Sequence, residues 1–179
     1  MNPRSEADCL RYAADLEAAY RDAHITDLAD VRSQLAAKRA LEVAVAGHHT
    51  ITLTGNAPID IRHLRSAFPS IGGDPAMFVE NGEIRVVVVP ASQADIVIGD
   101  PVEPTDVIRA RIARAQAAIP AVGGYDLAAA ALLDRIRELD LDVELIRRIC
   151  PTVAALEGAT CINRLHVGEA LTFQWRPSR

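Results

Sequence analysis

The stretch ITLTGNAPIDIRHL, residues 51–64, decides how the rest of this sequence is interpreted. A β-branched apolar run leads to Gly55, a short turn follows, and a helix is predicted to begin near residue 59. This order is the outline of a phosphate-binding loop. A working loop also needs a Lys for the β/γ charge and a Ser or Thr for Mg²⁺. The corresponding positions here carry Asp60, Ile61 and Arg62.

Apolar periodicity predicts helices on both sides of this stretch. The predicted helices cover residues 5–22, 27–46, 59–68, 104–118, 125–139, 142–157 and 163–173. Ser5 is the expected N-cap of the first helix, and Gly47 is expected to stop the second. Pro151 lacks an amide donor and is expected to split or kink its helix.

Strands are predicted at two places. The first covers residues 50–54, and the second belongs to a β-hairpin over 77–90, because Asn81-Gly82 favours a tight type I′ turn. The run of four valines at 86–89 is apolar on both faces, so a strand covered on both sides is expected. Glu80 and Glu83 would then flank the turn in solvent.

Composition limits the function classes. The 179 residues carry a net charge of −5, which argues against a broad basic surface for nucleic acid. No polybasic run suits an anionic membrane, and no apolar run approaches the length of a bilayer span. Three widely spaced cysteines and an N-terminus without an apolar signal core favour free thiols and a cytoplasmic location.

A longer segment around the loop resembles a known family. Residues 27–55, DLADVRSQLAAKRALEVAVAGHHTITLTG, are similar to the segment that leads into the Walker A strand of magnesium-chelatase-like AAA+ ATPases of bacteria. This family includes a competence-linked helicase and the chelatase I subunit. The matching positions are Asp30, Val31, Gln34, Ala37, Lys38, Arg39, Ala40, Leu41, Glu42, Ala44, Ala46, Gly47 and His49. Ser33 replaces a family glycine.

The resemblance continues downstream. Residues 83–116 are similar to the family's passage from ATPase core to lid, and residues 152–176 to its last lid helices. The lid positions that fit are Thr152, Ala154, Leu156, Gly158, His166, Val167, Glu169, Ala170, Leu171 and Phe173.

The family's catalytic motifs are missing or altered. Well over a hundred residues, with the Walker B acidic pair, separate Walker A from the lid in the family, whereas residues 70–82 occupy that interval here. The sensor 2 position falls on Leu141 or Glu144, and neither is an Arg. The resemblance therefore implies a degenerate, truncated relative without ATP hydrolysis, because the charge compensation for phosphate is lost.

Three further groups of residues have the chemistry of a binding site. A vestigial nucleotide site would use Gly55, Asn56, Ala57 and Arg62. A basic stripe of Arg109, Arg111 and Arg114 is either a solvated helix face or a partner contact. The pair His48-His49 is not expected to bind metal, because neighbouring strand residues point to opposite faces.

The sequence thus predicts an α/β protein with a reduced AAA+-like core, a small sheet and a C-terminal all-helical lid. Residues 1–100 would form the core with its N-terminal helices and hairpin, residues 101–179 the lid, and the loop at 91–103 the boundary. The leading hypothesis is a non-enzymatic interaction or regulatory module without a cofactor, which binds a protein partner, such as an intact AAA+ relative, or itself. The alternatives are nucleotide binding without hydrolysis and a DNA-associated adaptor.

Overall fold

The computed structural model describes residues 6–90, 103–139 and 141–174. Its α-helices are α1 (Glu6–Asp22), α2 (Leu35–Gly47), α3 (Pro58–Ala67), α5 (Thr105–Ala118), α6 (Leu127–Glu138), α7 (Val143–Leu156) and α8 (Arg164–Thr172). The strands are β1 (Ile51–Gly55) and β2 (Ile84–Val88). Short 3₁₀ turns are η1 (Leu28–Asp30), η2 (Phe68–Ile71), η3 (Pro75–Met77) and η4 (Ile119–Ala121).

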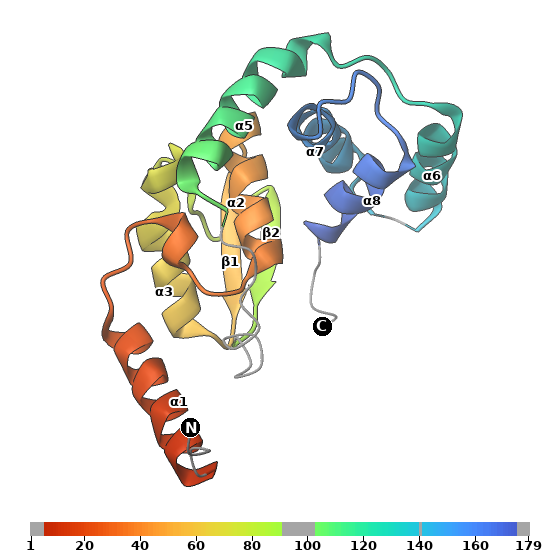
Figure 1. Ribbon diagram of the computed structural model, residues 1–179. Helices are drawn as coiled ribbons and strands as arrows, with labels where there is room; N and C mark the ends of the chain where they lie inside the picture. Colours follow the sequence, from red (N-terminus) through yellow and green to blue (C-terminus); the bar gives the residue numbers. More distant parts are fainter. Residues whose placement is uncertain (1–5, 91–102, 140, 175–179) are drawn as a thin grey trace.

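The core is built on a two-stranded parallel sheet. β1 and β2 pair in the register from Ile51↔Ile84 to Gly55↔Val88. Side chains on one face are fully buried, among them Ile51 and Ile84. α2 packs on the two strands and α5 crosses α2, while α3 follows β1 along the other side of the core (Figure 1). Residues 40–46 of α2 are all buried, which places this helix at the centre of the core.

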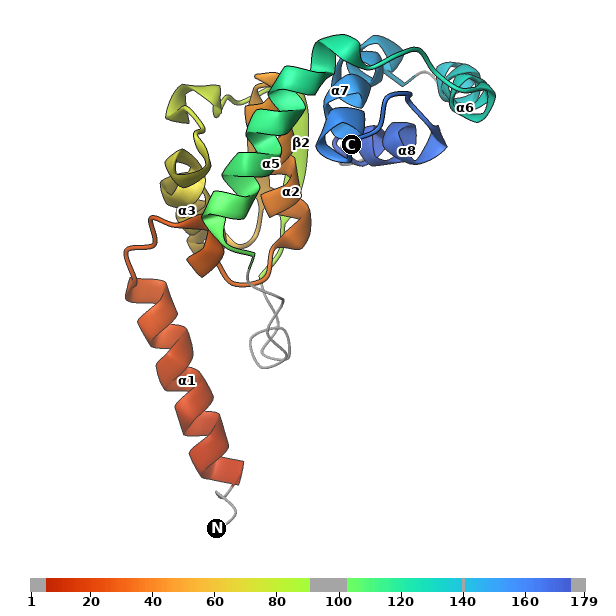
Figure 2. The ribbon, with the colours of Figure 1, turned by 45° about the horizontal axis from the view of Figure 1, so that its top comes forward.

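The C-terminal helices form a second layer beside the core. α5 connects to it, and α6, α7 and α8 gather on the side of β2 (Figures 1 and 2). α7 is the central helix of this lid, because it contacts α2, α5 and α8. A small core sheet followed by a helical C-terminal part confirms the predicted fold class.

The predicted hairpin at 77–90 is wrong. β2 pairs with β1 in parallel, and Phe78 forms a single parallel bridge to Ile51 on the opposite side of β1. Neither Asn81 nor Gly82 has the positive φ that a type I′ turn requires. Gly82 is needed for close approach instead: a Cβ there would lie 2.7 Å from the carbonyl carbon of Ile51. The sequence therefore predicted Gly82 as a turn residue, whereas the structure requires a glycine there because the Ile51 backbone passes so close.

Two other local predictions also fail. The predicted helix 27–46 is interrupted before α2, where Ser33 and Gln34 both take left-handed backbone angles, with φ of 49° and 62°. The valine strand is covered on one face only: Val88 is fully buried, whereas Val87 is 39 % exposed. Val87 instead lines an open hollow between β2 and the C-terminal helices.

Pro151 does not split α7, which runs unbroken from Val143 to Leu156. A proline amide cannot bond to the carbonyl four residues back, which belongs to Arg147. The hydroxyl of Tyr125 donates to that carbonyl at 3.4 Å and replaces the missing bond. Burial raises the pKa of Tyr125 to about 12, so this donor keeps its proton at neutral pH.

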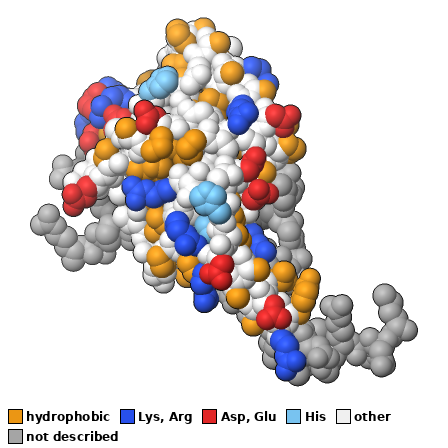
Figure 3. Space-filling model, turned by 90° about the vertical axis from the view of Figure 1, so that its left-hand side faces the viewer, with side chains coloured by type: hydrophobic (Ala, Val, Ile, Leu, Met, Phe, Trp, Pro, Cys, Tyr) orange, Lys and Arg blue, Asp and Glu red, His pale blue; other side chains and the backbone are white. Residues whose placement is uncertain are grey.

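The N-terminal helix α1 confirms the predicted helix 5–22 but packs little on the body. It extends away from the core (Figures 1, 2 and 3), and its last turn contacts α3 through Tyr20 and Arg21. Within the described ranges, no helix has the length and apolar character needed to cross a membrane. The predicted cap Ser5 and nearly all of the predicted boundary loop 91–103 lie outside the described residues.

Candidate functional site: the former phosphate loop and the core–lid contact

The connection from β1 to α3 is too short to curl around a phosphate. Only Asn56 and Ala57 separate the end of β1 from the first residue of α3. Gly55, at φ 126°, lies so close to β2 that an added Cβ would stand 2.0 Å from the carbonyl oxygen of Val88. Ala57 is buried, and Pro58 at the helix start has no amide to offer a ligand.

Two of the three residues at the positions of the family's Gly-Lys-Thr, Asp60 and Arg62, contact α1. Asp60 is 7 % exposed and accepts a hydrogen bond from the hydroxyl of Tyr20, with the oxygens 3.5 Å apart. Arg62 donates to the backbone carbonyl of Arg21. A phosphate would therefore meet a carboxylate and would lack the Lys and the Mg²⁺-binding hydroxyl, so these residues do not fit Mg·ATP.

Four residues were predicted as a vestigial nucleotide site, and the structure gives them separate environments. Gly55 is exposed but lies against the backbone of Val88, and Ala57 is buried. Asn56 is exposed, and Arg62 is directed to the end of α1. Nucleotide binding at these residues stays a prediction that no contact in the structure supports.

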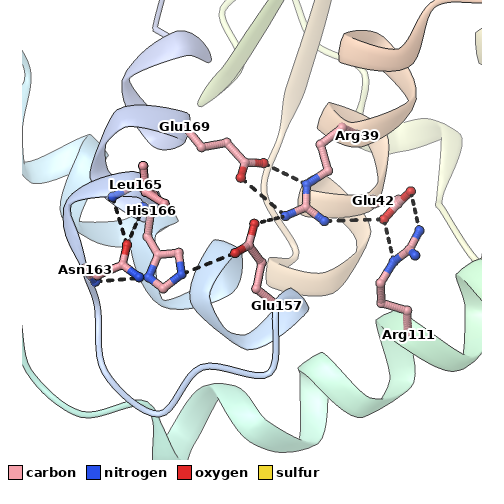
Figure 4. A network of polar contacts seen from close by, with 8 residues as sticks. All are labelled: Arg39, Glu42, Arg111, Glu157, Asn163, Leu165, His166 and Glu169. Carbon is pink, nitrogen blue, oxygen red and sulfur yellow. Dashed lines mark hydrogen bonds and ion pairs between the residues drawn. The ribbon is translucent and has the colours of Figure 1, made fainter.

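Some of the residues that resemble the family belong to a polar contact between core and lid (Figure 4), namely Arg39, Glu42, His166 and Glu169. Arg39 on α2 pairs with Glu169 on α8, and its Nε lies 2.7 Å from Oε1. The same guanidinium lies 3.5 Å from Glu157 after α7 and 3.7 Å from Glu42 on α2. Burial disfavours the charge on Arg39, but the three carboxylates outweigh it and raise its pKa.

Arg111 extends this contact to α5. It binds Glu42 through two nitrogens at 2.9 and 3.1 Å, and Glu103 at 2.7 Å. The hydrogen bond from Arg111 lowers the pKa of Glu103. Burial raises the pKa of Glu42, whose side chain is only 7 % exposed, although both arginines oppose this shift. Because Glu42 contacts two guanidiniums, the geometry favours its ionised form at neutral pH.

The start of α8 is fixed by a capping box. Asn163 accepts hydrogen bonds from the amides of Leu165 and His166, and its own amide donates to Nδ1 of His166 at 3.1 Å. Nε2 of His166 lies 3.6 Å from Glu157, which also contacts Arg39. The predicted cap Asn163 is confirmed, and it orients a helix that carries Glu169 toward the core.

A second polar contact joins core and lid around His49. Its Nδ1 lies 3.2 Å from Glu83, and its Nε2 lies 3.1 Å from the hydroxyl of Thr152 on α7. Glu83 also pairs with Arg148 of α7 at 2.8 Å. Glu83 is therefore engaged in the fold, which corrects the expectation that it is solvated. Burial lowers the pKa of His49 despite the nearby carboxylate.

The predicted arginine stripe divides into residues with different surroundings. Arg111 is held by two carboxylates, and Arg109 donates to the backbone carbonyl of Ser70. Arg114 is exposed. A partner contact through the stripe stays a prediction, in which Arg114 is the member without an intramolecular contact among the described residues.

Other reactive groups are structural. Where the chain is described, His, Cys, Asp and Glu side chains do not cluster in the threes that a metal site requires. Cys150 is fully buried, and burial raises the pKa of its thiol to about 12. Cys161 is exposed. The Cys150 thiol lies 4.0 Å from the backbone carbonyl oxygen of His166, and the Cys161 thiol donates to the carbonyl of Gly124 at 3.0 Å.

A hollow of about 970 Å³ lies between core and lid. Its walls include Ala36 of α2, Val87 of β2, Leu141 before α7, and Leu171 and Phe173 at the end of α8. We call it the core–lid groove. Periodicity did not predict it, because its walls come from four elements that meet only in the folded chain.

A comparison of the sequence with known families gives a match over the core of the structure. Residues 27–88 match the family model described as magnesium chelatase, subunit ChlI. The chain is a relative of the magnesium-chelatase-like AAA+ proteins. The matched segment runs from η1 to the end of β2 and so covers the reduced core; the resemblance of the lid lies outside it. A comparison with curated proteins gives no match.

Proposed function

We propose that this magnesium-chelatase-like AAA+ relative is a non-catalytic interaction module, which binds a protein partner or a second copy of itself. The observation that carries the proposal is the pair of substitutions at the former phosphate loop, Asp60 and Arg62, whose side chains contact α1. The family is ATPase- and chelatase-like. This chain lacks the cation and hydroxyl on which phosphoryl chemistry depends.

The core–lid contact holds the lid in a fixed position on the core, which suits a binding surface made by both parts. Arg39 and Arg111 join α2, α5 and α8 through Glu42 on α2, Glu169 on α8 and Glu103 just before α5. Beyond the C-terminal end of α2, His49 and Glu83 tie α7 to the sheet. Two separated sets of polar bonds resist rotation of the lid on the core, so the two parts present one continuous surface.

The core–lid groove supplies an apolar part of that surface. Val87 is 39 % exposed, and nearby Val89 and Leu35 are each 59 % exposed. The side-chain amide of Gln34 donates to the carbonyl of Val89 at 2.8 Å, which brings the start of α2 to the end of β2. Exposed aliphatic side chains around a concave surface are typical of protein-binding sites.

Size-exclusion chromatography with light scattering tests the proposal. The chain is measured alone and mixed with an intact magnesium-chelatase-like AAA+ protein. The expected result is a dimer or a mixed complex that Val87→Asp weakens at least tenfold. The matched control is Val107→Asp, because Val107 on α5 is 44 % exposed and lies outside the groove. A strict monomer that forms no complex with the relative contradicts the proposal.

Calorimetric titration with Mg·ATP and Mg·ADP tests the alternative of nucleotide binding without hydrolysis. The expected result is no heat of binding and no thermal shift, because Asp60 repels phosphate and Arg62 is engaged by α1. Saturable binding in the micromolar range, lost in Asn56→Asp, would replace the proposed function with the alternative. A gel shift at low salt would test the DNA-associated role.

A further inference from the structure

The last turn of α1 is the part of this helix that is fixed to the core. The ring of Tyr20 packs edge-on against His63 of α3, with centroids 4.6 Å apart. The guanidinium of Arg32 lies over the same ring at 4.6 Å. The Tyr20 hydroxyl accepts a hydrogen bond from the amide of Arg32 at 3.2 Å and donates to Asp60. Tyr20 thus contacts His63, Arg32 and Asp60.

The other half of this contact comes from the first two turns of α3. Asp60 is 7 % exposed and His63 is 1 % exposed, so both are buried beneath α1. Arg62 donates a hydrogen bond to the carbonyl of Arg21. This is one of the last carbonyls of α1, which receive no hydrogen bond from amides of their own helix. A cation at this end also interacts favourably with the helix dipole.

We propose that residues 60–63 form a socket for α1, at the helix turn where a phosphate loop would hold its ligand. Asp60 takes the Tyr20 hydroxyl, and Arg62 takes the end of the helix, so these two side chains set the direction in which α1 leaves the core. The residues that remove phosphate binding therefore have a positive role. At the position where the family binds its ligand, they attach α1 to α3 of the same chain.

This inference does not rest on the proposed protein partner. It concerns the isolated chain, and it predicts the dynamics of α1 whether or not the chain associates. Because α1 packs little elsewhere, loss of the socket should free the whole helix. A 17-residue helix without tertiary contacts is marginal in water, so a freed α1 should also lose helical structure.

Hydrogen–deuterium exchange of the full chain tests the socket. Peptides that cover residues 16–24 are compared in the native protein, in the double variant Asp60→Ala/Arg62→Ala, and in Tyr20→Phe. Exchange is expected to be about tenfold faster in Tyr20→Phe, because this variant loses both the long contact with Asp60 and the hydrogen bond from the Arg32 amide, and faster still in the double variant. Peptides from α7 are the internal reference and should not change.

Tyr12→Phe is the matched control, because it removes the same hydroxyl from the same helix outside the socket. Tyr12 is 56 % exposed, and loss of its hydroxyl should raise exchange at residues 16–24 less than Tyr20→Phe does. If exchange in the α7 peptides also rises in the double variant, that variant is destabilised throughout. The test of the socket then rests on Tyr20→Phe alone. Unchanged exchange at residues 16–24 in Tyr20→Phe, or an equal increase in Tyr12→Phe, overturns the proposal.

A second variant restores the phosphate-loop residues, with Asp60→Gly, Ile61→Lys and Arg62→Thr together. The socket predicts that this chain releases α1, so exchange at residues 16–24 rises. If α1 instead keeps its native protection, the side chains at 60 and 62 do not hold it, and the proposal fails. Exchange at residues 16–24 tests the socket, whereas light scattering tests association with a partner. Failure of one proposal therefore leaves the result of the other unchanged.

Discussion

Replacing Arg39 with Gln should weaken the attachment of the lid to the core. The charge-assisted bond to Glu169 at 2.7 Å is worth about 2 kcal/mol at this partly buried site. The contacts at 3.5 and 3.7 Å to Glu157 and Glu42 add about 0.5 kcal/mol each, which is typical of partly solvated pairs. The expected loss in the free energy of unfolding is therefore about 3 kcal/mol.

Denaturation in urea, monitored by circular dichroism, measures this loss. For a chain of this size the midpoint of thermal unfolding should fall by about 9 °C. The control is Arg137→Gln, whose i,i+3 pair with Asp134 is exposed at both ends and should contribute less than about 0.5 kcal/mol. A double-mutant cycle with Glu169→Gln should give a coupling of about 1–2 kcal/mol. The reasoning is refuted if Arg39→Gln costs no more than Arg137→Gln.

Three further predictions follow from burial and close packing. Gly55→Ala should cost about 2–4 kcal/mol by urea denaturation, because its Cβ meets a carbonyl at 2.0 Å, while Gly168→Ala, with open space around it, stays within about 1 kcal/mol. Mass spectrometry after brief alkylation of the native protein should find Cys161 modified and Cys150 protected; equal modification contradicts the assignment. Burial lowers the pKa of His49 in the folded state below its ordinary 6.5, so the unfolded chain binds more protons just below that pH. The free energy of unfolding should then fall with decreasing pH, by up to about 1.4 kcal/mol per unit, and less steeply in His49→Asn.

The helices were largely predictable because each depends on local periodicity and caps. The predicted ranges 104–118 and 125–139 agree with α5 and α6 within two residues at each end. Asn163 was recognised as a cap, since its side chain bonds amides only two and three residues away. The absence of a phosphate-binding Lys and Thr beside Gly55 is likewise a property of the sequence.

The errors arose where a distant segment determined the local backbone. Asn81-Gly82 has the composition of a hairpin turn, but the backbone of Ile51 passes so close that residue 82 must be glycine for packing. Pro151 should break α7, but the hydroxyl of Tyr125 replaces the lost hydrogen bond. Neither partner can be identified from residues adjacent in the sequence.

The sequence by itself determined the α/β class, most of the helices and the absence of a phosphate-binding Lys and Thr beside Gly55, because short-range periodicity and side-chain chemistry specify them. Only the tertiary structure decided what the remaining charges do. Arg39 and Glu169 are 130 residues apart, and Tyr20 and Asp60 are 40 apart, so the packing of α2 on α8 and of α1 on α3 selects these partners. A charged side chain carries no local signal of its partner, because Coulomb attraction depends on distance in space and on burial.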